Sequence, residues 1–153
     1  MNTEPQGVKQ YATFMVGGFY FGIEVLDVQE VLREQRVTPV PFAPRAVEGL
    51  INLRGQIVPA LDMRVLLNLP PREGGELPHS MVVRTEYGAI SLQVDDIQDV
   101  LELEPTNYEP PPLNLDSDLM PLVQGVYKLE DRFLMVLQAL GTTRIGASPA
   151  AQA

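Results

Sequence analysis

Short apolar runs alternate along the chain with turns and charged residues. The runs are rich in Val, Ile, Leu, Phe and Tyr, a composition that favours β-strands. Fourteen prolines and twelve glycines interrupt the chain so often that long helices do not fit between them. The pattern predicts strands at 10–16, 20–24, 51–54, 56–62, 80–85, 88–94, 100–103, 123–129 and 132–136.

Glycine marks the predicted turns. We expect hairpin turns at 16–19, 54–55 and 86–88, because glycine supplies the positive φ that tight turns require. Two longer connections, 70–78 and 104–121, are rich in proline, and the first has nothing to bury. Most strands should therefore be joined by short turns, with two long loops between them.

Only two segments are expected to be helical. Residues 45–49 follow Pro44 and are predicted to form a short helical turn. Residues 63–68 follow Asp62, whose side chain suits an N-cap, and they end before Pro70. Helix is therefore a minor part of the predicted structure.

The chain contains an internal repeat. A shift of about 69 residues places Val28-Gln29-Glu30-Val31-Leu32 on Ile97-Gln98-Asp99-Val100-Leu101. After a longer connection the match resumes at a shift of about 76, which places 49–53 on 125–129 and 57–61 on 133–137. Any two hydrophobic hairpins look alike, but the repeated pairing of a glutamine with an acid favours a duplicated supersecondary unit.

Each repeat holds about five short strands, which is too few for a sandwich and suits a small closed barrel without exposed edges. The sequence therefore predicts a mostly β fold in which two barrels pack into a single domain at 10–141. The approximate subdomains are 14–69, expected to form the first barrel, and 79–141, expected to form the second, and the ends 1–9 and 146–153 are expected to be flexible tails.

Composition excludes several classes of function. The chain has no cysteine, which removes disulfides, zinc fingers, thiolate nucleophiles and iron–sulfur clusters, and which fits a reducing cytoplasm. Its net charge of −9 argues against nucleic-acid binding, because neutralising phosphates requires a basic face. The first ten residues are polar, and no apolar run is as long as a membrane span, so we expect neither a secretory signal nor membrane insertion.

The chain offers few candidates for catalysis. Its single histidine, His79, follows the first long loop and is expected to be a solvated loop residue. Asp95, Asp96 and Asp99 could do acid–base chemistry only inside a pocket that shifts their pKa values, and strand alternation places several of the acids on a solvated surface. We therefore expect no catalytic residue, no cofactor and no metal site, and an unrecognised enzyme would have to use these three acids.

A binding surface is the stronger candidate. The predicted hairpin tip at 52–55 carries Arg54, whose guanidinium offers five donors in a rigid fork. Arg54 could pair with the carboxylate of a partner, or it could pair internally with Glu30, and both alternatives stay open. Phe42 could likewise lie in the core or serve as an exposed apolar anchor.

At these residues the sequence resembles the CheW family. The most specific motif is G-x-x-N-L-R-G-x-I-V-P-x-x-D-x-R at 49–64, supported by matches at 21–31, 94–101 and, more weakly, 125–136. The resemblance covers about residues 11–140. It implies two intertwined five-stranded SH3-like barrels related by a pseudo-twofold axis, with short helices.

The resemblance also implies a function without catalysis. Members of the family are scaffolds, or adaptors, that couple chemoreceptors to the histidine kinase CheA in chemotaxis, a form of two-component signal transduction. The implied partners are the regulatory domain of CheA and the cytoplasmic tip of methyl-accepting chemoreceptors. The implied location is the cytoplasm, at membrane receptor arrays that the protein joins through its partners. Chains of this pattern also serve pilus-motility pathways.

The family's contact positions can be carried over onto matching residues. Val28 and Glu30 match positions implicated in kinase contacts and in the receptor array, and Val100 and Leu101 match a segment near the groove between the barrels. The hairpin positions implicated in receptor and signalling contacts are Gly49, Asn52, Leu53, Arg54 and Gly55.

Two features depart from the family pattern. The proline-rich connections are idiosyncratic, and the residues at 141–146 make the family's C-terminal helix doubtful. The alternative function is a regulatory double barrel that binds a small molecule in the groove between its barrels. A shallow apolar groove bordered by Arg54 would favour the adaptor, whereas an enclosed polar cavity would favour a sensor or an enzyme.

Overall fold

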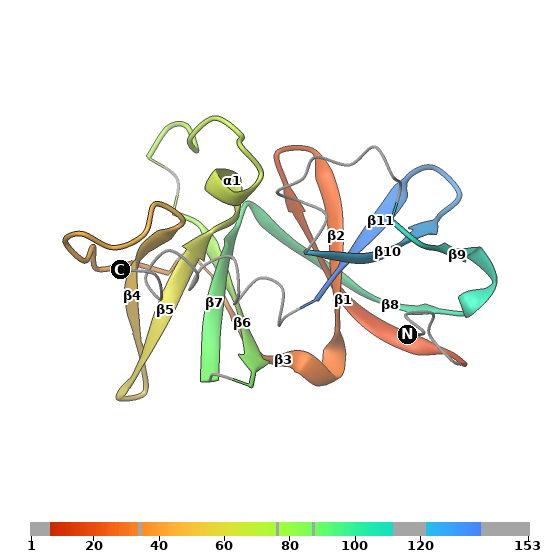
Figure 1. The fold of residues 1–153 in the computed structure, drawn as a ribbon, viewed down its shortest axis with the longest axis horizontal. Helices are drawn as coiled ribbons and strands as arrows, with labels where there is room; N and C mark the ends of the chain where they lie inside the picture. Colours follow the sequence, from red (N-terminus) through yellow and green to blue (C-terminus); the bar gives the residue numbers. More distant parts are fainter. Residues whose placement is uncertain (1–6, 34, 76, 87, 112–121, 139–153) are drawn as a thin grey trace.

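The computed structural model of the chain describes residues 7–33, 35–75, 77–86, 88–111 and 122–138. These residues form two β-sheets that lie side by side (Figure 1). The six-stranded sheet has the order β8 (Asp96–Leu103), β1 (Lys9–Val16), β2 (Phe19–Glu24), β11 (Phe133–Leu137), β10 (Val123–Lys128) and β9 (Tyr108–Glu109). The five-stranded sheet has the order β3 (Val28–Leu32), β6 (His79–Thr85), β7 (Gly88–Val94), β5 (Gln56–Asp62) and β4 (Val47–Leu53).

Among the described residues, helix is confined to three short pieces. The α-helix α1 spans Met63–Leu66, and two 3-10 turns span Val25–Asp27 (η1) and Pro105–Asn107 (η2). The predicted N-cap of α1 is confirmed, because Asp62 Oδ1 accepts a hydrogen bond of 2.9 Å from the backbone N–H of Arg64. None of the helices among the described residues is long and apolar enough to cross a membrane.

All nine predicted strands are present, with ends that differ by up to four residues. Two strands, β3 and β9, were not predicted. The helical turn predicted at 45–49 is wrong, because β4 already begins at Val47 and pairs with β5. His79 is not in a loop as predicted but is the first residue of β6, opposite Val94. The 86–88 turn, the tails and the 104–121 connection lie partly, and the 141–146 segment wholly, outside the described residues.

The two sheets are built on one plan. Without β9, the order β8-β1-β2-β11-β10 corresponds strand for strand to β3-β6-β7-β5-β4 under the sequence repeat. Each sheet takes strands from both repeats, because β3 leaves the first repeat to pair with β6, and β8 leaves the second to pair with β1. The predicted intertwining is therefore confirmed, and the ranges 14–69 and 79–141 mark the sequence repeats and not the two sheets.

Even the irregularities of the sheets are repeated. Gln29 is an extra residue between two paired positions of β3, and β8 has a matching register shift opposite β1. Glu48 in β4 and Gln124 in β10 are extra residues in the same way. A β-bulge of this kind turns the following side chains to the other face of the strand. The duplication inferred from sequence thus extends to backbone detail.

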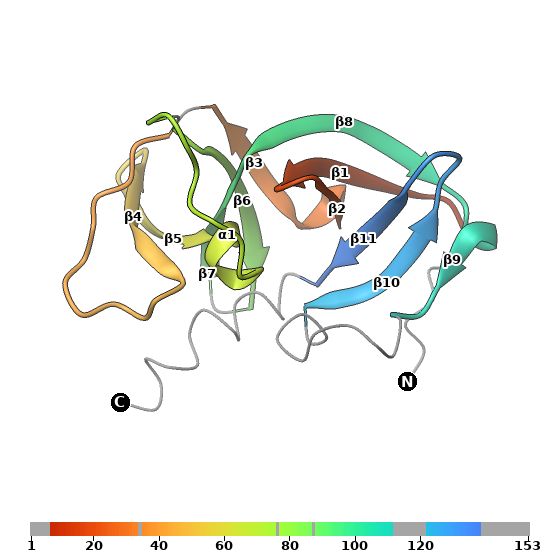
Figure 2. The same ribbon diagram turned by 90° about the horizontal axis from the view of Figure 1, so that it is seen from above.

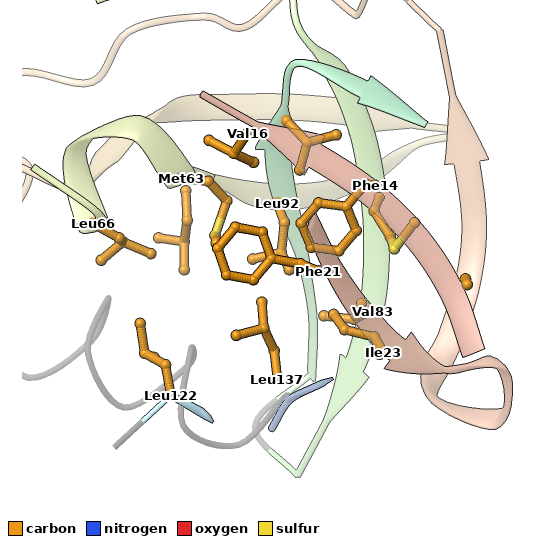
Figure 3. Close-up of a cluster of buried hydrophobic side chains, with 14 of the residues drawn as sticks. Phe14, Val16, Phe21, Ile23, Met63, Leu66, Val83, Leu92, Leu122 and Leu137 are labelled. Carbon is orange, nitrogen blue, oxygen red and sulfur yellow. The ribbon is translucent and has the colours of Figure 1, made fainter. Parts of the chain in front are cut away.

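A shared apolar core joins the sheets (Figure 3). Phe14 and Phe21 come from the six-stranded sheet and stack with ring centroids 5.7 Å apart. Leu92 comes from the five-stranded sheet, and Met63 extends from α1 between them. Each of these side chains is fully buried, which stabilises the fold by about 1.5–3 kcal/mol per side chain. Separate clusters fill the two barrel interiors, one rich in tyrosine and one aliphatic.

Candidate functional site

The tip of the β4–β5 hairpin is a two-residue turn. Leu53 and Gln56 form the last pair of the ladder, and the residues between them, Arg54 and Gly55, have φ values of 53° and 87°. Two successive positive φ values are typical of a type I′ turn, whose twist matches that of the strands. Asn52 Oδ1 accepts a hydrogen bond of 2.8 Å from the N–H of Gly55, which fixes the turn from within.

Arg54 is held at this tip by Glu30. Its Nη1 donates to Glu30 Oε2 at 2.6 Å and its Nη2 donates to Glu30 Oε1 at 2.8 Å. This is the two-bond fork that arginine forms with carboxylates. The internal pairing considered from the sequence is therefore present. The Arg54 side chain is nevertheless 75% exposed, against 17% for Glu30, so its remaining N–H donors stay accessible.

The bulge at Gln29 orients Glu30. Val28 pairs with Val83 and packs against the shared core, whereas Glu30 pairs with Val82, which belongs to the aliphatic barrel interior. The one extra residue thus places Val28 and Glu30 on different faces of β3. Because β3 and β4 are the two edge strands of the five-stranded sheet, the ion pair between Glu30 and Arg54 also links its edges.

Gly49 and Leu53 lie beneath the hairpin surface. A Cβ atom on Gly49 would overlap the carbonyl of Thr38, which exchanges backbone hydrogen bonds of 2.8 Å with Leu50. Leu53 is 6% exposed and packs in the aliphatic interior with Ile51. These two residues position the tip, and the exposed groups on it come from Asn52, Arg54 and Gly55.

The structure does not bring Val100 and Leu101 to this hairpin. Both lie on β8 in the other sheet, where Val100 is exposed and Leu101 packs against the tyrosine cluster. Phe42 does not lie in the core but is exposed, because its side chain is completely accessible to solvent. Phe42 also has a φ of 62°, which is uncommon for a bulky side chain.

The aspartates do not form an acid–base site. Several of the acids in this run were expected on a solvated surface, and Asp95 is not one that lies free there, because its carboxylate accepts hydrogen bonds from the side chains of Arg64 and Arg72. Burial opposes its charge, but these bonds and one from the Gly17 N–H outweigh burial and lower the pKa of Asp95. Asp96 accepts instead from the exposed Gln98 side chain. Within the described part of the chain, no group of three or more acids or histidines could hold a metal ion.

Sequence reasoning missed an apolar pocket on the six-stranded sheet. Its volume is about 550 Å³, and its lining includes Phe19, Phe133, Met15 and Met135. Arg132 lies at its edge with its guanidinium carbon 3.7 Å from the centre of the Tyr20 ring. The pocket is mostly apolar and Arg54 does not border it. Its sequence signal was the presence of Phe19 and Phe133, two large exposed side chains directly after turns.

The structure thus has two barrels that share strands. One carries a stiff charged hairpin and the other an apolar pocket, and together they define a double-barrel scaffold. The chain belongs to the CheW-like domain family, whose family model matches residues 10–144.

Named relatives agree with this assignment. The chain is 28% identical over 139 residues to the chemotaxis protein CheW of Bacillus subtilis, covering 91% of this chain and 89% of that one. It is 29% identical over 132 residues to the chemotaxis protein CheW of Treponema pallidum, covering 84% and 78%. The crystal structure of the scaffolding protein TtCheW from Thermoanaerobacter tengcongensis superposes with a TM-score of 0.77 at 26% identity, covering 86% and 90%. The predicted SH3-like double-barrel fold is thereby confirmed.

Proposed function

We propose that this protein is an adaptor that couples the cytoplasmic tip of methyl-accepting chemoreceptors to the regulatory domain of the histidine kinase CheA. The observation that carries the proposal is Arg54, exposed at a rigid hairpin tip and oriented by Glu30. Membership of the CheW-like family and the likeness to a scaffolding protein support it. Such an adaptor would work in the cytoplasm and reach receptor arrays through its partners.

The ion pair supplies a physical route for coupling. In this proposal Val28 and Glu30 contribute to the kinase contact, and Asn52, Arg54 and Gly55 contribute to the receptor contact. Arg54 uses two of its five N–H donors on Glu30 and can offer the others to a carboxylate of a partner. Because the two contact sets are joined by direct hydrogen bonds, a partner that displaces one side chain alters the other. A scaffold can then bias the kinase through differential affinity alone.

The remaining proposed contact residues play two different roles. Gly49 and Leu53 hold the hairpin in place from below, since neither presents a side chain at the surface. Val100, with 57% of its surface exposed, and Leu101 would contribute from the other sheet. The adaptor would therefore meet its partners along both barrels and not at one point.

The alternative function, a small-molecule sensor, gains no support from the apolar pocket. Ligand sites combine an apolar lining with a few converging polar groups. Of the four charged residues that line this pocket, Lys128 and Glu109 already pair with each other at 2.6 Å. An open apolar surface of this kind suits a protein side chain better than a polar ligand.

The proposal is tested by co-sedimentation with CheA and receptor cytoplasmic fragments from the same genome. We expect the unmodified protein to join a ternary complex, and Arg54→Ala or Glu30→Ala to bind about tenfold or more weakly while staying folded. Arg45→Ala is the matched control, because Arg45 is also an exposed arginine on the same barrel.

The outcomes separate function from site. If the unmodified protein binds neither partner, the adaptor proposal fails. If it binds both, and the two variants bind as well as Arg45→Ala, the function stands and the assigned hairpin site is wrong.

A further inference from the structure

At the second of its crossings between the sheets, the connection in the chain is a single residue long. Asp95 lies between β7, in the five-stranded sheet, and β8, in the six-stranded sheet, and Figure 2 shows β8 running from one sheet along the other. The backbone N–H of Asp95 donates to the carbonyl of Met15 at 3.0 Å. A change in the angle between the sheets must therefore be accommodated at this position, at the β2–β3 crossing and in the core that the sheets share.

An ion cluster surrounds this crossing. The Asp95 carboxylate accepts from Arg64 Nε at 2.9 Å and Nη2 at 2.7 Å, from Arg72 Nε at 3.1 Å and from the Gly17 N–H at 2.7 Å. The three charged side chains are only 13–21% exposed. Ion pairs shielded to this degree are costly to break, because removing one partner leaves an uncompensated charge.

The cluster also holds the first long loop. Arg64 Nη1 donates to the carbonyl of Pro70 at 2.7 Å, and Arg72 itself comes from the 70–78 connection that was predicted to bury nothing. Leu69 packs against Gly17, where a Cβ atom would overlap it. The loop is thus held against the β1–β2 turn of the six-stranded sheet and against Asp95, where the chain leaves the five-stranded sheet.

Arg72 is the least satisfied member of the cluster. Its Nη2 is buried and has no hydrogen-bond partner in the described part of the chain. An unpaired buried donor costs about 1–3 kcal/mol, which favours release of this side chain over release of Arg64, whose fork is fully used. The cluster therefore has one member that can leave while the Arg64–Asp95 pair remains.

The corresponding crossing in the first repeat is held differently. There the chain passes from β2 to β3 through η1, and Arg84 Nη1 donates to the carbonyls of Leu26 at 3.2 Å and Val28 at 3.1 Å. Those acceptors are neutral backbone groups. The first crossing has charges near it, the Lys9–Glu24 ion pair at 3.2 Å and the Asp27 carboxylate, but its arginine donates to backbone carbonyls. At the second crossing two arginines share one carboxylate, so the two halves of the molecule differ at the point where they exchange strands.

We propose that the Arg64–Asp95–Arg72 cluster is a directional lock on the β7–β8 crossing that sets the orientation of one barrel against the other, with Arg72 as the positioning residue that opens it. The shared apolar core resists separation of the sheets but is not directional, so small sliding motions are left to the cluster to restrain. This inference rests on the proposed adaptor function, because transmission between partners on two barrels requires a defined geometry between them.

The test measures distances between the barrels. The chain has no cysteine, so Ile57→Cys and Phe133→Cys place one spin label on each barrel, at equivalent positions that are 60% and 61% exposed. Double electron–electron resonance spectroscopy should give one narrow distribution of distances between the two labels in this protein. Adding Arg72→Gln should broaden it about twofold or add a second population, because two orientations become accessible.

Two further variants show whether the effect belongs to the Arg72 side chain. Glu109→Gln breaks an exposed ion pair within one sheet and should leave the distribution unchanged. Arg72→Lys keeps the charge without the planar fork and should give an intermediate width; it decides the matter if the glutamine variant does not fold. If Arg72→Gln and Arg72→Lys both match the parent distribution, the lock does not exist.

A binding measurement separates this inference from the adaptor proposal. In unlabelled protein, Arg72→Gln should keep each binary affinity for kinase and receptor fragment but reduce the cooperativity between them, which for coupled sites is typically about 5–150-fold, to about twofold or less. Unchanged cooperativity overturns the lock alone. Absence of binary binding by the parent protein overturns the adaptor proposal, whatever the distance measurement gives.

Discussion

The β4–β5 and β10–β11 hairpins occupy equivalent places in the two repeats and end differently. The first carries Arg54 and Gly55 in a tight turn and fastens its arginine to Glu30. The second closes through a backbone hydrogen bond of 2.8 Å from Leu129 to Arg132, whose guanidinium stacks on Tyr20. One backbone frame therefore supports an arginine fixed by a carboxylate on one barrel and, on the other, a tip with exposed charges beside an apolar pocket.

The barrel interiors differ in the same way. In the six-stranded sheet Tyr11 and Tyr127 join their hydroxyls at 3.1 Å. At equivalent depth in the five-stranded sheet, Ser80 donates to Gln93, which donates to Ser91. Both sets of buried polar groups are satisfied, as a stable core requires. Duplication preserved the frame and left the side chains free to diverge, so that the two barrels need not bind the same partner.

The largest predicted effect comes from Asp95→Asn, which removes the carboxylate shared by two arginines at the β7–β8 crossing, whereas the β2–β3 crossing is held through backbone carbonyls. Losing the carboxylate leaves two shielded guanidiniums without an anion, so we expect the free energy of unfolding at pH 7 to fall by about 3 kcal/mol. Urea unfolding measures this, and Asp99→Asn, the same substitution at an exposed aspartate of β8, serves as the control. A loss below about 1 kcal/mol would show that the cluster contributes little to stability.

The same variant has a pH signature. The pKa of Asp95 in the folded protein lies below its ordinary value of 3.8, so its contribution to stability is present above that value and disappears as the pH falls through the lowered pKa. The parent should therefore lose stability faster than Asp95→Asn below about pH 4. Parallel acid-unfolding curves for the two proteins would contradict this.

A smaller effect should follow from adding a methyl group at the two equivalent bulges. In Gly49→Ala the new Cβ meets the backbone carbonyl of Thr38, and in Gly125→Ala it meets the ring of Tyr108. We expect each to cost about 1–3 kcal/mol, the first more than the second because a side chain yields more easily than backbone. Thermal unfolding ranks the two. Equal melting temperatures for the parent and both variants would mean that a side chain fits at Gly49 and at Gly125. The close backbone approach at the two bulges would then not explain why both positions hold glycine.

The smallest effect concerns the ion pairs of the two barrels. Arg54 and Glu30 share two hydrogen bonds with one partner well shielded, whereas Lys128 and Glu109 share one contact with both partners about half exposed. A double-mutant cycle with alanine should give a coupling energy of about 0.5–1 kcal/mol for the first pair and less for the second. High salt should shrink both. A larger coupling for Lys128 and Glu109 would remove the distinction between a fixed tip and an ordinary surface pair.

Most of the fold was predictable from the local pattern of apolar residues and glycines. Alternating apolar residues and glycine turns located every strand that belongs to a hairpin. The repeat predicted two packed barrels, whereas the exchange of strands between the sheets was implied only by the resemblance to the CheW family. The pattern failed for β3, where Val28 and Glu30 face different sides because of a bulge, so that no period of two is visible. It also failed at 45–49, where a bulge again hides the strand.

The site was predictable in part. The exposed arginine at 54 and its alternative partner Glu30 followed from turn chemistry and charge, and the pair is present. The burial of Arg72 and the pocket beside Phe133 did not follow, because both depend on contacts between segments far apart in the sequence. Local sequence shows that a charge exists, whereas only tertiary structure shows what surrounds it.

The exchange of β3 and β8 constrains how the protein can be synthesised. When the first repeat leaves the ribosome, β3 has no neighbour to pair with, because β6 has not yet been made. The six-stranded sheet waits longer still, since β2 pairs with β11, close to the end of the described chain. Long-range pairing of this kind slows folding and leaves strand edges exposed during translation. A nascent chain that stalls between the repeats therefore holds no finished half and exposes unpaired strand edges, the feature that makes incomplete chains prone to aggregation.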